Sequence, residues 1–293
     1  MDFELHNVSY DPASKTPTGR CLATHTKRDG TTAPLVLEWI SSIPTGLTIS
    51  LVQLRDELPT NSRRPEETRT LRFAGLHRER GRAALAYELP YVPATLRDVL
   101  ESVPKPSTSD RCALARLVTT QVRSLHVHFR NIHMGLRTES FVFLRNPAMQ
   151  EKKQNGNGNG VEIGPGDLDL RNPYLLDWGR ESSPSVYQYP EFDAHKKLWY
   201  YDVWSLLIIL SEIAEWKPLG SCPTDAAGLR ARKKEIMRRI TSDGWKGETT
   251  ARLFRFGFGF LEAIRLETMS WGVIKKFFDQ LCELLDTSGD AKV

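Results

Sequence analysis

One stretch of the sequence decides the fold: His133-Met134-Gly135-Leu136-Arg137-Thr138-Glu139-Ser140, followed directly by Phe141-Val142-Phe143-Leu144. The four apolar residues at its end predict a short, buried strand. Upstream, residues 109–130 open with Ser109-Asp110, a helix N-cap signal, and then carry apolar side chains at helical spacing. The chain is therefore expected to pass from a long helix through a polar loop into a strand.

The sequence before this helix has the character of a β-sheet. Its apolar runs are short and are separated by glycine, proline, aspartate or charged residues, as in antiparallel strands. One helical pattern, at residues 50–58, interrupts them and is ended by Pro59. The predicted strands are residues 20–27, 35–40, 70–76 and 83–88.

The sequence beyond residue 90 is mostly helical in pattern. The contrast predicts an α+β fold of two lobes, a small β-rich N-terminal lobe of residues 1–90 and a larger, mainly helical C-terminal lobe of residues 91–293. Besides 109–130, helices are predicted at residues 95–103, 199–215, 226–241, 249–267 and 272–285.

A segment at about residues 146–172 has neither pattern. It contains Asn-Gly-Asn-Gly-Asn-Gly at 155–160, and such a tract lacks the apolar side chains whose burial would offset the entropy of ordering. We expect a flexible insertion here, followed by a short strand at 173–176.

Composition and charge narrow the classes of protein. The 293 residues are 40% hydrophobic and 26% charged, which is ordinary for a globular protein and excludes a mainly disordered or fibrous chain. The net charge of +4 is spread over 40 basic and 36 acidic residues. The basic clusters at 63–64 and 230–239 are short or interrupted, so we interpret them as solvated faces and expect no nucleic-acid partner.

Cysteine spacing and hydropathy indicate the cellular compartment in which the protein is expected. The four cysteines are far apart and form no Cys-x-x-Cys pair, which argues against a zinc site or a disulfide framework and favours a reducing, intracellular location, cytoplasmic or nuclear. The N-terminus lacks the pattern of a signal peptide. The longest apolar stretch, 198–214, contains charged residues and is too short to span a bilayer, so a buried helix and no membrane association are expected.

The quoted loop resembles the catalytic loop of protein kinases, His-Arg-Asp-Leu-x-x-x-Asn. In that family the Asp accepts the proton of the substrate hydroxyl and the Asn holds a magnesium ion. Here His133 matches the His, Met134 replaces the Arg, Gly135 replaces the Asp, Arg137 replaces the usual Lys and Ser140 replaces the Asn. The resemblance implies a loop that has kept its scaffold and lost its catalytic residues.

Three further motifs follow in the family's order, and the resemblance covers about residues 30–285. Residues 133–143 and 187–191 are most similar in sequence to divergent kinase-like domains of filamentous fungi. The motifs resemble Asp-Phe-Gly, Ala-Pro-Glu and the Asp-x-Trp-Ser-x-Gly helix, and they read Asp177-Trp178-Gly179, Tyr189-Pro190-Glu191 and Tyr201-Asp202-Val203-Trp204-Ser205.

For five of these residues the resemblance implies structural roles. His133 is expected to pack under the Asp177 motif and to form a hydrogen bond in the core. Trp178 and Gly179 are expected to pack beside it, and Glu191 to stabilise its own segment. Asp202 is expected to anchor the backbone of the loop from the following helix.

The N-terminal part departs from the family's pattern. No Gly-x-Gly-x-x-Gly loop precedes Leu35, and residues 35–40 take the place of the Val-Ala-Ile-Lys strand with about Ile40 at the lysine position. No lysine occurs from Asp29 through Pro104. The ion pair with the following helix is therefore expected to lack its cation. The alternative is that Lys27, or Arg28, reaches in from the preceding strand, as in kinases whose lysine is displaced there.

These departures weaken the case for a bound nucleotide. Asp177, Arg137 and Leu89 are the candidate nucleotide cleft, with Asp177 as the candidate magnesium ligand. The alternative is that Asp177 pairs locally with Arg137 or Arg180. Magnesium prefers octahedral oxygen ligands shared with phosphates. Here the second ligand has become Ser140 and the phosphate-binding lysine is absent, so we expect no cofactor and leave ATP with magnesium as the open alternative.

The functional expectation is a pseudokinase that acts as a scaffold or allosteric binding module, with enzymatic activity left open and its absence favoured. The first alternative is a divergent ATP-dependent kinase that transfers phosphate to Ser or Thr. The second is a nucleotide-binding module without transfer. A protein partner is expected, but nothing in the sequence identifies it or the oligomeric state.

Overall fold

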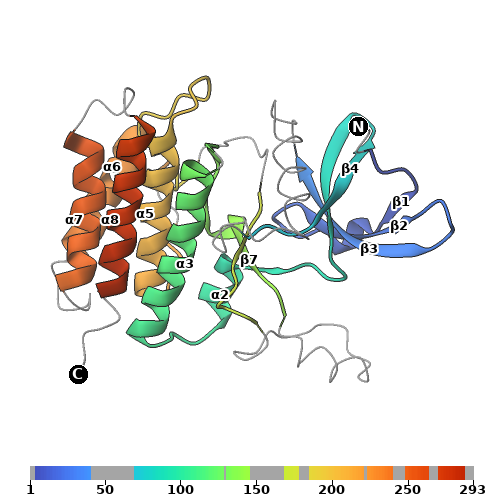
Figure 1. Ribbon diagram of the computed structural model, residues 1–293, viewed down its shortest axis with the longest axis horizontal. Coiled ribbons are helices and arrows are strands. Elements are labelled where there is room, and N and C mark those ends of the chain that lie inside the picture. The colour runs from blue at the N-terminus through green and yellow to red at the C-terminus, as the bar shows by residue number, and fades with distance from the viewer. Residues whose placement is uncertain are drawn as a thin grey trace.

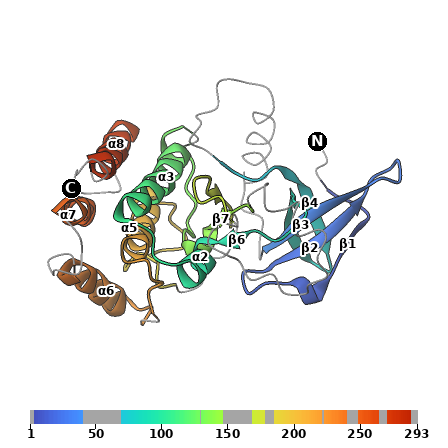
Figure 2. The same cartoon turned by 90° about the horizontal axis from the view of Figure 1, so that it is seen from below.

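The computed structural model describes residues 4–40, 69–128, 130–145, 168–177, 185–220, 223–239, 248–263 and 270–287 (Figure 1). The fold is α+β, with an antiparallel sheet at one end of the molecule and a group of helices at the other (Figures 1 and 2). The helix expected at 50–58 and residues 146–167 of the expected insertion lie outside the described residues.

The sheet has five strands in the order β1-β2-β3-β5-β4, and every neighbouring pair is antiparallel. The four predicted strands are confirmed, although the third begins three residues later than expected. The short edge strand β1 was not predicted. The strands are β1 (Val8–Tyr10), β2 (Arg20–Thr26), β3 (Thr32–Ile40), β4 (Phe73–Glu79) and β5 (Arg82–Glu88).

Two tight turns close the hairpins of this sheet. Gly30, between β2 and β3, has a φ of 82°, and Arg80 and Gly81, between β4 and β5, have φ values of 48° and 77°. Two consecutive residues with positive φ match the right-handed twist of the strands that they join. A glycine adopts this backbone conformation without a steric cost, which explains its place in both turns.

Both faces of the sheet are buried, and this decides where β3 directs its side chains. Leu35, Leu37 and Trp39 lie in a small core on one face. Val36 and Ile40 point to the other face and belong to the main core, which continues into the helices. Because side chains alternate along a strand, Glu38 also points toward the main core.

The helices pack around one nearly fully buried helix, α5 (Trp199–Glu215). Helix α3 contacts α5 and α8, and α7 contacts the same two helices. A helix that is apolar all round is expected in such a central position, as the sequence predicted for 198–214. The other helices are α2 (Leu96–Ser102), α3 (Thr108–Val127), α6 (Ala226–Arg239), α7 (Glu248–Ala263) and α8 (Trp271–Thr287).

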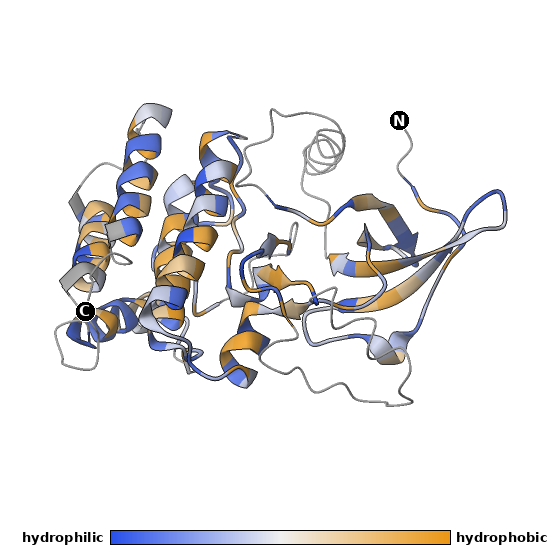
Figure 3. Ribbon diagram, turned by 60° about the horizontal axis from the view of Figure 1, so that its bottom comes forward, coloured by the Kyte–Doolittle hydropathy of each residue, from blue (hydrophilic) through white to orange (hydrophobic). Residues whose placement is uncertain are grey.

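The helix N-termini agree with their capping signals, with one correction. Thr95 and Asp98 form a capping box at the start of α2. Helix α3 begins at Thr108 and is capped by Ser107, whose side chain accepts from the Asp110 amide, and not by Ser109 as the sequence suggested. Outer helices such as α8 show an apolar and a polar side (Figure 3). No helix in the described part of the chain is long and apolar enough to cross a membrane.

A small second sheet holds the quoted loop next to the end of β8. Its strands run in the order β6-β7-β8 and are antiparallel. The 3-10 turn Thr138–Ser140 leads directly into β7, and the Leu176 amide donates to the Ser140 carbonyl at 2.8 Å. The strands are β6 (Ala94–Thr95), β7 (Phe141–Phe143) and β8 (Tyr174–Leu175).

Candidate functional site

Asp202, in the first turn of α5, holds the backbone of the quoted loop. Its side chain is buried, and its two carboxylate oxygens accept from the His133 amide at 2.7 Å and the Met134 amide at 2.8 Å. His126 of α3 lies 3.1 Å from the same carboxylate. Met134 has a φ of 66°, a conformation that persists only where the surroundings impose it. The contacts agree with the anchoring role expected for Asp202.

His133 ties the loop to the residue before Asp177. Its Nε2 atom lies 2.8 Å from the Leu176 carbonyl oxygen, and its side chain is buried. The histidine therefore packs under the start of the 177–179 motif as expected. Trp178 and Gly179, the other two residues of that motif, lie outside the described residues.

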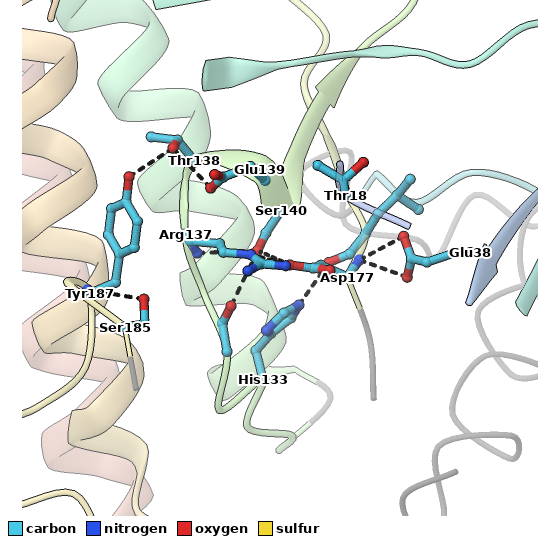
Figure 4. A network of polar contacts seen from close by, with 12 residues as sticks. Thr18, Glu38, His133, Arg137, Thr138, Glu139, Ser140, Asp177, Ser185 and Tyr187 are labelled. Atoms are coloured by element: carbon cyan, nitrogen blue, oxygen red, sulfur yellow. Dashed lines mark hydrogen bonds and ion pairs between the residues drawn. The ribbon is translucent and has the colours of Figure 1, made fainter. Parts of the chain in front are cut away.

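Asp177 pairs with two residues of the loop (Figure 4). Its Oδ2 atom accepts from Arg137 Nε at 2.7 Å and from Ser140 Oγ at 3.3 Å. Asp177 is 2% exposed and has a φ of 70°. The structure thus realises the local pairing with Arg137 that the sequence analysis had weighed against magnesium binding, while Arg180 lies outside the described residues.

Glu38 of β3 reaches Asp177 from the five-stranded sheet. Its carboxylate accepts from the Asp177 amide, with distances of 3.0 and 3.3 Å to its two oxygens (Figure 4). Burial raises the pKa of Glu38, and so does the nearby Asp177 carboxylate, whereas Arg20 lowers it. The residue of β3 that meets the loop is therefore Glu38. Ile40, expected at this place, lies in the hydrophobic core.

Arg20 of β2 is the cation beside Glu38. The two residues are opposite each other in the β2–β3 register, and Arg20 Nε donates to Glu38 Oε2 at 2.9 Å. Its Nη2 atom donates to the Glu139 carbonyl oxygen at 3.1 Å, so the side chain bridges the sheet and the loop. Burial disfavours the charged form, but Glu38 and Asp177 outweigh it and raise the pKa of Arg20.

The sequence predicts no cation in place of the lysine, and the alternative that it leaves, Lys27 or Arg28, lies at the other end of β2 from Arg20. Lys27 and Arg28 are exposed beside the hairpin turn that contains Gly30, whereas Arg20 begins the strand. Seven residues at about 3.3 Å each separate the two ends by about 20 Å. The sequence contained one usable signal, an arginine directly before the apolar residues Cys21, Leu22 and Ala23 of the strand, but nothing local distinguished it from a solvated side chain.

Arg20, Glu38, Asp177 and Arg137 together form what we call the charge network. It contains two guanidinium groups and two carboxylates, and it connects β2 and β3 with the loop and the end of β8. Such a network is costly to break: leaving one buried charge without its partner typically costs about 3–5 kcal/mol.

Three predicted site residues lie away from the charge network or contribute no side chain to it. Gly135 offers only its backbone, and its carbonyl oxygen lies 3.4 Å from Ser140 Oγ. Leu89 is buried in the main core just after β5. Glu191 forms an ion pair with Arg230 of α6 on the surface.

The residues around Asp177 do not fit a magnesium-bound nucleotide. Magnesium takes hard oxygen ligands in octahedral geometry, yet Arg137 and Ser140 both donate to Asp177 Oδ2. The guanidinium of Arg137 would also repel a divalent cation at this distance. In the part of the chain that the structure describes, no group of three His, Cys, Asp or Glu side chains is placed to hold a metal ion.

Comparisons with known proteins add no family assignment. No protein-family model matches the chain, and no curated protein matches it. The geometry of the charge network and of the quoted loop therefore carries the functional argument.

Proposed function

We propose that the chain is a two-lobed, kinase-like domain that does not transfer phosphate and acts as a protein-binding scaffold whose conformation is independent of nucleotide. Its N-terminal lobe would be residues 1–90 and its C-terminal lobe residues 91–293. The support is the order of the four motifs along the chain, together with the contacts of Asp202 and His133, which hold the loop in a defined shape.

The observation that carries the proposal is the pairing of Asp177 with Arg137 and Glu38. The Asp177 carboxylate accepts from Arg137 at 2.7 Å, and its amide donates to the buried Glu38 carboxylate at 3.0 Å. A metal ion or a phosphate entering here would have to compete with the contacts that Asp177 makes with Arg137 and Glu38. Loss of the Arg137 contact without a replacement carries the cost of an unpaired buried charge, about 3–5 kcal/mol.

The missing general base supports the same conclusion. Gly135 has no side chain to accept a proton, and a positioned acid or base contributes about 10²–10⁴-fold to the rate of such a reaction. Phosphoryl transfer depends further on electrostatic positioning by metal ions and a cation. The neighbouring cations, Arg20 and Arg137, are both engaged with carboxylates.

The charge network supports a scaffold because it joins the two halves through the chain's own side chains and backbone. Arg20 donates to the Glu139 carbonyl oxygen, and Glu38 accepts from the Asp177 amide. Each contact connects the sheet to the helical half. A surface that spans both halves would then keep one shape for a protein partner at any nucleotide concentration.

Thermal unfolding with and without millimolar ATP and magnesium tests the proposal. A ligand that binds the folded protein at 100 times its Kd stabilises it by about 2.7 kcal/mol. Since we expect no binding of ATP, the unfolding midpoint should stay unchanged. A midpoint that rises with ATP and no longer rises in Asp177→Asn would contradict the proposal and favour a nucleotide-binding module. Transfer of labelled phosphate by the wild-type protein, lost in the same variant, would favour an active kinase.

A further inference from the structure

A second buried polar cluster lies on the other side of the Thr138–Ser140 turn. It centres on Glu212 of α5, whose side chain is fully buried. The Tyr187 hydroxyl lies 2.8 and 3.0 Å from the two carboxylate oxygens of Glu212. The Leu219 amide donates to one of them at 2.7 Å. Glu212 therefore fastens two segments, the one before and the one after α5, to the central helix.

The hydrogen bonds continue from Tyr187 toward the surface. The Tyr187 hydroxyl lies 2.8 Å from Thr138 Oγ1, which lies 3.2 Å from Glu139 Oε2 (Figure 4). Two hydroxyl groups thus connect two carboxylates, Glu212 in the core and the half-buried Glu139. We call this row of four side chains the hydroxyl relay.

Counting hydrogens shows that the relay favours a protonated Glu212. Three contacts join its four members: Glu212 to Tyr187, Tyr187 to Thr138 and Thr138 to Glu139. When both carboxylates are ionised, the two hydroxyls supply two hydrogens for these three contacts. A proton on either carboxylate supplies the third. Glu212 is fully buried and Glu139 only half-buried, so the cost of burying a charge places the proton on Glu212, which then donates to Tyr187, Tyr187 to Thr138 and Thr138 to Glu139.

The charges around Glu212 act in opposite directions: Glu139 raises the pKa of Glu212 and Arg97 lowers it. Glu139 of the turn faces it as a like charge, and Arg97 of α2 is the cation that acts on it, although Arg97 pairs with Glu101 on its own helix. Among the described residues no cation forms an ion pair with Glu212. Burial raises the pKa of Glu212 from 4.5 to about 7, and the Leu219 amide and Tyr187 offset this only in part.

We propose that Glu212 is a pH-sensitive latch: its protonated side chain holds Tyr187 and residues 185–192 against α5, and release of the proton to water loosens them. The same segment is further held by Ser205 Oγ, which donates to the Tyr187 carbonyl oxygen at 2.7 Å. Tyr189 also packs against Tyr201 and Trp204 of α5. These contacts carry no charge, and the exposed Glu191–Arg230 ion pair joins the same segment to α6 and not to α5. The pH response of the contact with α5 is therefore assigned to Glu212.

The direction and size of the effect follow from linkage between protonation and folding. A carboxyl whose pKa is higher in the closed form than in water favours the closed form at low pH, and this preference is lost as the pH rises from 4.5 through about 7. Between about pH 5.5 and about pH 8 the equilibrium should shift toward the open form by roughly 25-fold. This inference does not depend on nucleotide binding, and its test is independent of that question.

The test compares the full chain with Glu212→Gln, which keeps the shape of the acid and a donor for Tyr187 but cannot ionise. Urea unfolding at about pH 5.5 and about pH 8 gives the ratio of the wild-type unfolding constant to that of the variant. We expect this ratio to rise roughly 25-fold with pH. Hydrogen exchange, corrected for its intrinsic pH dependence, should place the wild-type loosening in residues 185–192.

Two further variants keep the result interpretable. Glu215→Gln removes another glutamate of α5, one that pairs with Arg239, and its ratio to wild type should stay constant with pH. Thr138→Val removes the contacts that require the third hydrogen, so its pH dependence should be smaller than that of the wild type. This comparison decides the matter if Glu212→Gln does not fold. A pH dependence as large in both Glu212→Gln and Thr138→Val as in the wild type would overturn the proposal.

Discussion

At the scale of single residues, Arg20 is the side chain that joins the five-stranded sheet to the loop, although it belongs to none of the four kinase-like motifs. Its side chain is fully buried, pairs with Glu38 and donates to the loop. An arginine suits this place because its planar guanidinium donates in several directions at once and stays charged. Without it, the guanidinium left in the charge network for the carboxylates of Glu38 and Asp177 would be that of Arg137, whose side chain is 24% exposed.

Replacing Arg20 by methionine should lower the free energy of unfolding by about 3–5 kcal/mol, because Glu38 is left as an unpaired buried charge. The double variant Arg20→Met, Glu38→Leu should recover most of that loss, since it removes both charges. Urea unfolding of the two single variants and the double variant measures the coupling. Arg72→Met serves as the control, because Arg72 is 65% exposed and its pair with Glu88 contributes about 0–1 kcal/mol. Additive losses in the cycle would contradict a coupled pair.

At the scale of elements, the close packing of α7 on α5 depends on one glycine. A Cβ atom at Gly257 would lie 2.5 Å from Leu207 Cδ2, and Leu207 is fully buried. Gly259, one half-turn away on the same helix, has open space at its Cβ position. Alanine variants at these two positions therefore distinguish the effect of packing from the effect of helix propensity within α7.

Gly259→Ala should stabilise the protein by up to about 1 kcal/mol, because alanine restricts the unfolded chain and favours the helix. Gly257→Ala gains the same propensity but forces α7 and Leu207 apart, and overpacking of a core costs about 1–3 kcal/mol. Thermal unfolding of both variants should therefore place Gly257→Ala below Gly259→Ala. Equal stabilities would mean that Leu207 moves aside without cost.

At the scale of the whole molecule, the site is spread over both halves of the chain. Its charge network takes Arg20 and Glu38 from the sheet and Arg137 and Asp177 from the helical half, and the hydroxyl relay adds Glu212 from the central helix. No single replacement therefore restores a catalytic arrangement.

Gly135→Asp should leave the protein without phosphotransfer, although it returns an acidic side chain to the position of the missing base. Asp177 remains paired with Arg137, and Arg20 remains paired with Glu38, so metal positioning is still missing. The measurement is transfer of labelled phosphate from ATP to the protein or to a generic substrate, with the wild type as the matched control. Transfer by the variant would show that the charge network yields to nucleotide.

The secondary structure was largely predictable from the sequence. The run 35–40, the apolar helix at 198–214 and the short helix at 95–103 are local patterns, and local patterns decide strands and helices. The edge strand β1 was missed because three residues carry too little pattern. Its existence depends on pairing with β2, which the sequence does not display.

The sequence by itself determined the strands, the buried central helix and the glycine at position 135 of the loop, because periodicity and residue identity are local properties. Only the tertiary structure decided which charges meet. Glu38 and Asp177 are 139 positions apart, and their contact depends on strand register and on how the sheet packs against the loop. The same holds for Arg20, whose partner is set by the β2–β3 register. A buried charge finds its partner through the fold, and for that reason the sequence offered only Lys27 or Arg28 as an alternative cation, whereas the structure has Arg20 beside Glu38.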